Sequence, residues 1–479
     1  MVSVIDDPRI KEKCQIFTPV DIVAKMLDLS GYSNDVVGKT ILENSCGNGE
    51  FLAEITERYI RDAISSGISL EGICKGLERD IVAYEIDKEL ISVCKNRLNS
   101  ITLRYNISDI QWNIHCGSFL SKEVTGKYDY IIGNPPYIAY PDLPENERKE
   151  LKSIFSTCKK GKFDYSYAFI EKSFDMLKTG GKLVYIIPSN IFKNVFAEEL
   201  RKLIKGDLTT VIDFPQDKVF SGVLVSPAII VVEKSIGSDH LSYTKVLGGK
   251  ETANLISKEK LVGKWVFDAL NTEGRRVGKH FKVSNSIATL CNRVFVLKSG
   301  YFESNFYCIG EDKIESAILK KTTGPKSKRS KKEKEEYLIF PYRYDQNGIL
   351  VHYTEEEMRE YFPSAMQYLD NHRAELDARD TDESAAWFEY GRSQALQNPP
   401  QKMIIISSVI SEDTKAYLLK GGEIPYAGLY ITPTGKITLE YLLKKLNSKS
   451  FKEYISCVGV SVSGSSKRIT TKDIENFAF

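Results

Sequence analysis

Residues 128–137 read Tyr-Asp-Tyr-Ile-Ile-Gly-Asn-Pro-Pro-Tyr, an apolar run that stops at two prolines. The run from Tyr128 to Ile132 predicts a buried strand. Proline has no backbone N–H for a sheet ladder, so Pro135 and Pro136 must take the chain out of the sheet. Asn134 is therefore expected at the carboxyl edge of a strand, where open α/β sheets hold their ligands. A plain turn capped by the asparagine would also explain these residues.

Two upstream stretches have the form expected of ligand-binding strand ends. Residues 40–52 predict a strand that turns through Gly47 and Gly49 into a helix, which lets the backbone approach a ligand closely. Residues 81–87 predict a second strand that ends in two acids. We assign Glu85 to ligand hydroxyls and Asp87 to the cap of the following helix. The long gap between these stretches predicts an additional helix over residues 68–79.

The remaining pattern alternates strands and helices, which indicates an α/β fold with a mainly parallel, seven-stranded sheet covered on both faces. The other strands are expected at 110–115, 180–190, 208–214 and 228–233, and helices at 21–29, 88–98 and 164–177. Thr18 and Asp21 are both candidate caps of the first helix. Residues 138–162 are polar and Lys-rich, which predicts a mobile loop beside the site.

Composition excludes several classes of protein. A length of 479 residues allows two domains, and no apolar run approaches a membrane span or forms a signal peptide. The nine cysteines form no Cys-x-x-Cys pair and the five histidines are scattered, which favours reduced thiols over disulfides or a metal centre. Residues 1–250 carry 32 basic and 34 acidic groups, and residues 251–479 carry 34 and 30, so any nucleic-acid surface must be local.

The order of these motifs resembles the gamma-class N6-adenine DNA methyltransferases of type II restriction-modification systems, the group of the TaqI methyltransferase. Phe17-Thr18-Pro19, the glycine loop at 43–52, Glu85 and Asn134–Tyr137 carry the resemblance. It implies a class I, Rossmann-like domain at 1–260 that binds S-adenosyl-L-methionine, and an α+β target recognition domain at 261–479. It also implies double-stranded DNA as partner, a prokaryotic cytoplasmic location and a separate cognate endonuclease.

The resemblance assigns cofactor contacts to twelve residues: Thr18, Pro19, Glu43, Asn44, Ser45, Gly47, Gly49, Glu85, Ile86, Ser118, Phe119 and Asn134. Glu43 would bind the methionine ammonium and Glu85 the ribose. Two positions depart from the family's usual pattern. Asn44 stands where a proline is usual, and Ser118 where an aspartate usually accepts from the cofactor's adenine amine, so the role of Ser118 stays open.

The catalytic motif implied by the resemblance is Asn134, Pro135, Pro136 and Tyr137. An adenine amine is a poor nucleophile because its lone pair is delocalised into the ring. The Asn134 side-chain oxygen and the Pro135 carbonyl can accept its two N–H groups and free the lone pair to attack a methyl sulfonium. Tyr137 can stack on a base outside the helix, and Phe220 on its other face. Burial of Phe220 in the core is the alternative.

The C-terminal half resembles the family's target recognition domain more loosely, at 286–295, 339–342 and 387–392. Residues 320–334 hold eight basic residues and one acid, and we interpret this run as disordered when free and bound to phosphates when occupied. The residues 461–470 suit either backbone contacts or a plain turn. The expected DNA contacts are Lys326, Lys328, Arg329, Lys331, Lys332, Ser465, Lys467 and Arg468.

Other functions fit parts of the sequence. Glutamine methyltransferases also use Asn-Pro-Pro-Tyr on a planar NH₂ group, but they are shorter and would not need residues 265–479. A fused nuclease is hinted at by Pro141-Asp142, Glu147 and Lys149, although nuclease carboxylates need a sheet to fix them. A non-catalytic DNA-binding module would not need Glu43, Glu85 and the intact motif together.

Overall fold

The computed structural model describes residues 17–121, 123–215, 219–220, 226–268, 273–329, 335–392, 402–462 and 466–479. It divides the chain into two compact units, Met1–Phe267 and Asp268–Phe479. The boundary expected from the sequence, after residue 260, falls seven residues before this division. Trp265 and Phe267 account for the difference, because both are buried in the core of the first unit and contact the ring of Phe192.

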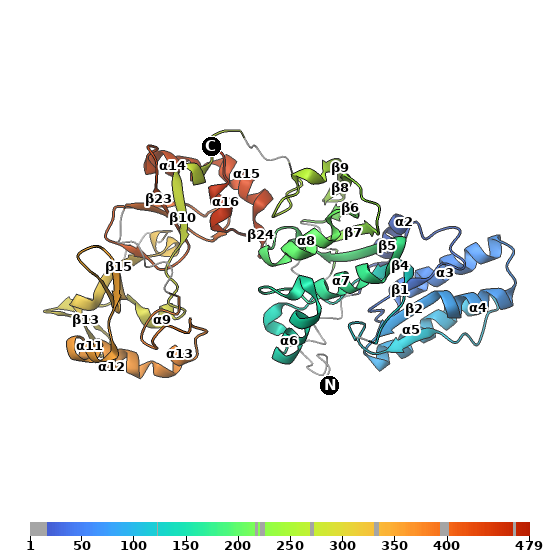
Figure 1. Cartoon of the computed structure of the whole chain (residues 1–479), viewed down its shortest axis with the longest axis horizontal. Helices are drawn as coiled ribbons and strands as arrows, with labels where there is room; N and C mark the ends of the chain where they lie inside the picture. Colours follow the sequence, from blue (N-terminus) through green and yellow to red (C-terminus); the bar gives the residue numbers. More distant parts are fainter. Residues whose placement is uncertain are drawn as a thin grey trace. The chain divides into compact units, whose positions relative to one another are not determined.

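The first unit is built on one mixed sheet (Figure 1). Among the described residues it has nine strands in the order β3-β2-β1-β4-β5-β7-β6-β8-β9. The five strands from β3 to β5 are parallel, whereas β7 is antiparallel to both β5 and β6. The strands are β1 (Ile41–Glu43), β2 (Ile81–Glu85), β3 (Asn113–Cys116), β4 (Tyr128–Gly133), β5 (Leu177–Pro188), β6 (Leu208–Asp213), β7 (Pro227–Glu233), β8 (His240–Leu247) and β9 (Lys250–Ser257).

Strand alternation creates two cores, one on each face of the sheet. Successive side chains of β5 illustrate this, since Leu183 and Tyr185 enter one hydrophobic cluster and Val184 and Ile186 enter the other. The second cluster is covered by α2 (Val20–Ser30), α3 (Glu50–Ser65), α4 (Leu70–Asp80) and α5 (Lys88–Leu103). The first is covered by α6 (Glu145–Ile154), α7 (Ser166–Met176) and α8 (Glu198–Lys205). This confirms an α/β sheet with helices on both faces.

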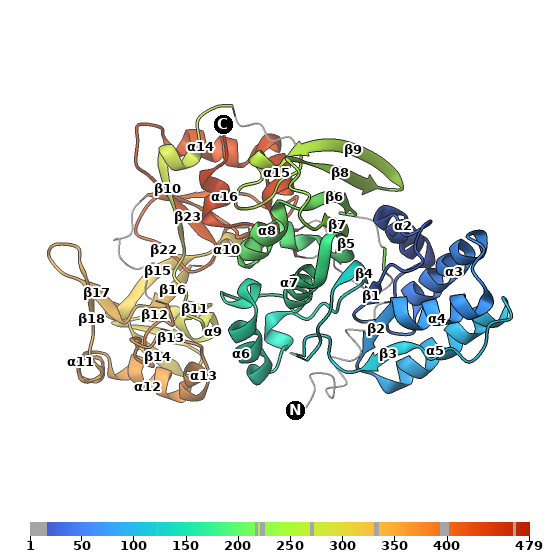
Figure 2. The same cartoon turned by 45° about the vertical axis from the view of Figure 1, so that its right-hand side comes forward.

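Several predicted details are wrong. The sheet has two more strands than expected, β8 and β9, which form a long ribbon (Figure 2). Residues 138–162 are not a loop, because they form α6 and the short turns η2 (Tyr140–Asp142) and η3 (Ser156–Cys158), and Leu151 and Phe155 enter the core. Neither Thr18 nor Asp21 caps α2, whose N-cap is Pro19. The additional helix α4 and the Asp87 cap of α5 are as predicted.

The second unit combines short strands with short helices, in agreement with an α+β fold. Its strands are β10 (Phe281–Asn285), β11 (Val296–Lys298), β12 (Tyr301–Glu303), β13 (Phe306–Ile309), β14 (Asp312–Glu315), β15 (Leu319–Thr323), β16 (Glu336–Ile339), β17 (Tyr342–Tyr344), β18 (Leu350–His352), β19 (Met403–Ile406), β20 (Val409–Ile410), β21 (Tyr417–Leu419), β22 (Ile424–Pro425), β23 (Leu429–Pro433), β24 (Val460–Ser461) and β25 (Lys467–Arg468). Its helices are α9 (Asn292–Phe295), α10 (Pro325–Arg329), α11 (Glu355–Tyr361), α12 (Pro363–Asn371), α13 (Arg373–Asp377), α14 (Leu439–Leu446), α15 (Lys449–Val458) and α16 (Thr471–Glu475).

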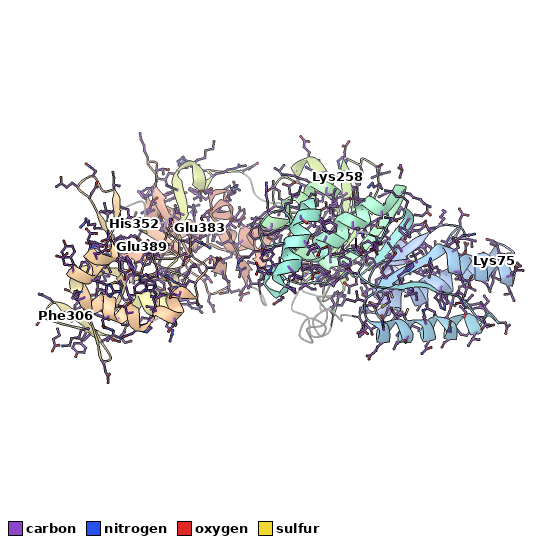
Figure 3. All side chains as sticks on the ribbon, turned by 60° about the horizontal axis from the view of Figure 1, so that its bottom comes forward. Lys75, Lys258, Phe306, His352, Glu383 and Glu389 are labelled. Carbon is purple, nitrogen blue, oxygen red and sulfur yellow. The ribbon has the colours of Figure 1, made fainter. Side chains whose placement is uncertain are left out.

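The second unit has its own hydrophobic core, which includes the fully buried Phe295 and Tyr390. A hydrogen bond between a surface histidine and a buried glutamate lies beside this core. His352 Nδ1 is 2.5 Å from Glu389 Oε1, and the two side chains lie together in Figure 3. No helix among the residues that the structure describes is long and apolar enough to cross a membrane.

Candidate active site

A cavity lies at the carboxyl ends of the central strands of the first unit. It holds about 970 Å³ of empty space, part of it open to solvent. The lining residues follow β1, β2, β3 and β4 or come from the segment before α2 and from α7. They are Phe17, Thr18, Glu43, Asn44, Ser45, Cys46, Gly47, Glu50, Phe51, Glu85, Ile86, Asp87, Leu90, Gly117, Ser118, Phe119, Asn134, Pro136, Ile138, Tyr165 and Phe169.

The glycine loop between β1 and α3 is tied to the end of β2 by the Glu85 carboxylate. Glu85 Oε2 accepts a hydrogen bond from Gly47 N at 2.8 Å, and Oε1 accepts from Ile86 N and Asp87 N at 2.8 and 3.0 Å. Gly47 and Gly49 both have positive φ, +52° and +88°. A left-handed backbone of this kind favours glycine. Glu85 thus shapes the loop as well as facing the cavity.

Glu43 places an almost completely buried carboxyl group against the cavity. The residue is 2% exposed, and Glu43 Oε2 has no hydrogen-bond partner among the described residues. Burial raises the pKa of Glu43 well above its usual value, and the nearby Cys94, Glu50 and Glu85 raise it further. An unsatisfied buried acceptor is costly, so this oxygen is suited to a ligand that brings a positively charged donor.

Asn134 is joined to two other segments that line the cavity. Its Nδ2 donates to Thr18 Oγ1 at 3.3 Å, and its backbone carbonyl accepts from Ser45 Oγ at 3.2 Å. The structure therefore brings together the Thr-Pro segment, the glycine loop and the Asn-Pro-Pro-Tyr stretch, which are far apart in the sequence. Pro136 and Ile138 continue the lining beyond Asn134.

The two aromatic residues assigned to base stacking differ in environment. The Tyr137 ring is half-buried, and its hydroxyl donates to the Ile186 carbonyl at 2.6 Å. Burial, with a smaller effect of Asp164, raises the pKa of Tyr137 well above its usual value. Phe220 is 4% exposed and belongs to the core cluster under α2 and α3, which is the alternative that the sequence left open. Phe220 does not line the cavity.

Of the twelve assigned cofactor residues, all but Pro19 and Gly49 line the cavity. These two are the N-cap residues of α2 and α3, so they shape the backbone behind the site. The Ser118 hydroxyl accepts from Leu120 N at 3.2 Å, which stabilises the turn after β3. Pro135 and Tyr137 of the motif do not line the cavity.

The assigned DNA contacts in the second unit lie on regular structure where they are described. Lys326, Lys328 and Arg329 are on α10, so this part of the basic run is helical and the prediction of a disordered loop is wrong for it. Lys328 is paired with Glu423 at 3.4 Å and Arg329 with Asp413 at 3.1 Å. Lys467 and Arg468 form β25, paired with β20 and β24. Lys331, Lys332 and Ser465 lie outside the described residues.

The structure also bears on the suggested nuclease residues and on contacts that the sequence did not reveal. Asp142 lies in a 3-10 turn and Glu147 and Lys149 on α6, so no strand fixes the suggested nuclease carboxylates. Within the described ranges, no three His, Cys, Asp or Glu residues form a cluster that could hold a metal. Sequence reasoning missed Ser173 and Tyr185, which bond to Asn44 from α7 and β5. Nothing local to either residue signals a contact across 129 and 141 positions.

Comparison with known proteins relates the chain to restriction-modification methyltransferases. Residues 54–220 match the family of Eco57I restriction-modification methylases. The chain is 25% identical over 385 residues to the type II restriction enzyme and methyltransferase RM.Eco57I of Escherichia coli, a match covering 70% of this chain and 38% of that protein. It is 33% identical over 236 residues to the type II methyltransferase M.HincII of Haemophilus influenzae, covering 48% and 39%. The matches thus span less than half the length of these relatives.

Solved structures resemble the fold over a larger part of the chain. The type IIL restriction-modification enzyme MmeI, solved in complex with DNA, superposes with a TM-score of 0.57 and 13% identity, covering 95% of this chain and 64% of that one. The range that matches the methylase family includes Glu85 and Asn134–Tyr137. The chain is therefore similar to methyltransferases of type II restriction-modification systems, and residues 54–220 are the range that matches the Eco57I methylase family.

Proposed function

We propose that the protein transfers a methyl group from S-adenosyl-L-methionine to the N6 amine of an adenine turned out of double-stranded DNA. The observation that carries the proposal is the set of hydrogen bonds that holds Asn134 to Thr18 and Ser45 beside the cavity with the buried Glu43. The names of the relatives add support, since they are type II methyltransferases, and MmeI was solved with DNA. We further propose that the protein is the modification half of a restriction-modification system, working alongside a separate endonuclease.

The cavity residues fit this cofactor. Glu43 would offer the ammonium of the methionine part a buried oxygen that has no hydrogen-bond partner in the described part of the chain. Glu85 could accept from the ribose hydroxyls while it holds the glycine loop, and Ser118 and Phe119, which line the cavity, would lie beside the adenine ring. When bound, the cofactor would supply an activated methyl group on a positively charged sulfur.

The motif residues would prepare the target amine. The Asn134 side-chain oxygen and the Pro135 carbonyl would accept the two N–H groups, which returns the lone pair to the nitrogen. The hydrogen bond from Asn134 Nδ2 to Thr18 Oγ1 would help to hold the amide beside the cavity. Tyr137, anchored through its hydroxyl to β5, would present its ring to the base. A stacking role for Phe220 would require the ring to leave the core.

The second unit would select the DNA sequence. Its proposed phosphate contacts are the exposed Lys326 and Arg329 of α10, together with Lys467 and Arg468. Such contacts raise affinity without selecting bases. Base selection would then belong to other parts of residues 268–479.

The proposal is tested by supplying the protein with radiolabelled S-adenosylmethionine and duplex DNA of mixed sequence, then separating the nucleosides. We expect label in N6-methyladenine. Asn134→Ala should lower the rate about a hundredfold or more, as for other lost transition-state hydrogen bonds, with cofactor affinity largely retained. Label in cytosine, transfer to a protein glutamine instead of DNA, or a variant as fast as the wild type would contradict the proposal.

A further inference from the structure

Asn44, next to Glu43 at the end of β1, belongs to a closed group of buried polar side chains. Asn44 Nδ2 donates to Ser173 Oγ on α7 at 3.0 Å and to the Tyr185 hydroxyl on β5. Ser173 Oγ and the Tyr185 hydroxyl share a third hydrogen bond of 2.7 Å. Burial raises the pKa of Tyr185, so its hydroxyl stays neutral and remains able to share a proton. All three residues are almost completely buried.

This group uses one end of the Asn44 amide and leaves the other without a partner. Asn44 Oδ1 has no hydrogen-bond partner among the residues that the structure describes, although the residue is only 3% exposed. Asn44 and Glu43 both line the cavity, and Glu43 Oε2 also lacks a hydrogen-bond partner among the described residues. Neighbouring buried acceptors without donors are rare in native proteins.

A single ligand group can satisfy both oxygens. An ammonium carries three N–H donors and no acceptor, so it can bond to a carboxylate and an amide oxygen together. A hydroxyl has one donor and could serve only one of them. In the structure the amide nitrogen of Asn44 faces the hydroxyls of Ser173 and Tyr185. Asn44 Oδ1 and Glu43 Oε1 lie 3.9 and 4.0 Å from the point that a Cβ atom on Gly133 would occupy, so both side chains bring an oxygen to the same place at the end of β4.

We infer that Asn44, oriented by Ser173 and Tyr185, is a second acceptor for the α-ammonium of the methionine part of the cofactor. The inference rests on the proposed function. Asn44 would bind the ammonium directly, whereas Ser173 and Tyr185 are positioning residues that act through Asn44.

A direct contact between Asn44 and the ammonium can be distinguished from a general packing role by comparing two ligands. S-adenosylhomocysteine carries the ammonium, and 5′-methylthioadenosine has the same nucleoside and thioether without it. Calorimetry on the full-length chain should show that Asn44→Ala weakens S-adenosylhomocysteine about tenfold or more, as expected for a hydrogen bond to a charged group. The affinity for 5′-methylthioadenosine should not change. Equal losses for both ligands, or no loss, would overturn the inference.

Tyr185→Phe removes one anchor of the amide and keeps the ring, so it tests the positioning role even if Asn44→Ala does not fold. Tyr167→Phe is the matched control, because Tyr167 is a fully buried tyrosine of the same core that does not line the cavity. Only Tyr185→Phe should weaken S-adenosylhomocysteine selectively, and identical behaviour of the two variants would overturn the positioning role. A wild-type protein that binds neither ligand would refute the proposed function itself, whereas normal wild-type binding with unaffected variants would refute only this inference.

Discussion

Ionising the buried Glu43 carboxyl at the cavity costs free energy in the folded protein. Burial, then Cys94, Glu50 and Glu85, raises the pKa of the Glu43 carboxyl in the folded state. The folded protein therefore holds a proton that the unfolded chain releases once the pH exceeds the usual range of a glutamate. The stabilising contribution of Glu43 is complete below that range and is lost as the pH rises toward the raised value.

Glu43→Gln should relieve this cost, because an amide keeps the size of the side chain without ionising. As the pH rises above the usual range of a glutamate, the wild type should lose stability relative to the variant, by at most about 1.4 kcal/mol in the free energy of unfolding per pH unit for one proton. Cofactor affinity should fall about tenfold or more, because a bound ammonium would favour the ionised carboxylate, which an amide cannot supply. Urea unfolding at a series of pH values and calorimetry measure the two effects. A stability difference that does not depend on pH would mean that Glu43 is ionised in the folded protein.

Residue positions were predictable where they depend on local chain geometry. Glu85 lines the cavity and Asp87 caps α5, as expected from a strand that ends just before a helix, but Asp87 also lines the cavity. The position of Phe220 was not predictable, because aromatic side chains suit both cores and stacking sites. The contacts of Asn44 depend on how α7 and β5 are brought beside β1, which no local pattern encodes.

Among the structural elements, the turn from β1 into α3 is tightly constrained by sterics. Gly49 has φ +88°, and a Cβ atom there would lie 2.6 Å from Cys94 Sγ on α5. The turn therefore requires glycine for two reasons, backbone conformation and the approach of α5. Gly67, after the other end of α3, has a similar φ of +71° but no atom within 4 Å of the same position.

These two glycines give a matched pair of variants. Gly67→Ala should cost about 1–2 kcal/mol, the ordinary cost of a left-handed alanine. Gly49→Ala should cost more, because α5 must also move, and it should weaken cofactor binding while Gly67→Ala does not. Urea unfolding and calorimetry on both variants test this. Equal losses in the free energy of unfolding would show that Cys94 can move aside and that only the backbone conformation requires glycine at position 49.

Elements with a clear apolar periodicity were predictable, and those without it were missed. β9 is almost entirely exposed, so it has no alternation to detect, although Gly248-Gly249 between two runs is a signal for a two-residue hairpin turn. α6 buries only Leu151 of its ten residues, which explains why it reads as a polar loop. The strands of the predicted sheet lie near their expected positions, and β5 and β7 contain continuous buried apolar runs. β3 has no such run and begins at Asn113, three residues after its expected start.

Helix α10 provides a test of phosphate binding. Replacing Lys326 and Arg329 with glutamine should weaken binding to cognate and unrelated DNA alike and should flatten the dependence of log affinity on log salt. The slope should change by roughly 0.9 for each phosphate that the variant no longer neutralises. Lys75→Gln is the control, since Lys75 is an exposed lysine of the first unit, on α4 (Figure 3). An unchanged slope of log affinity against log salt would mean that α10 does not contact phosphates. A change in the DNA sequence that is methylated would mean that α10 contacts bases.

At the scale of the molecule, the two units divide the proposed work. The first has a cavity with a buried acid and the Asn-Pro-Pro-Tyr stretch, and the second has its own core and a helix of basic residues. The sequence predicted this division because strand–helix alternation ends near Trp265. It could not predict the strand pairing of the second unit, whose strands are short and whose apolar positions lack a sustained period.

The central claim, that this chain methylates adenine in DNA through Asn134, is tested most directly by sequencing DNA from a host that expresses it. The sequencing should detect modified bases and their context, and a host with the Asn134→Ala variant should be compared. The account predicts N6-methyladenine at one recurring sequence with the wild-type protein and none above background with the variant. Unmodified adenine in the presence of folded wild-type protein, or the same modification with Asn134→Ala, would contradict it.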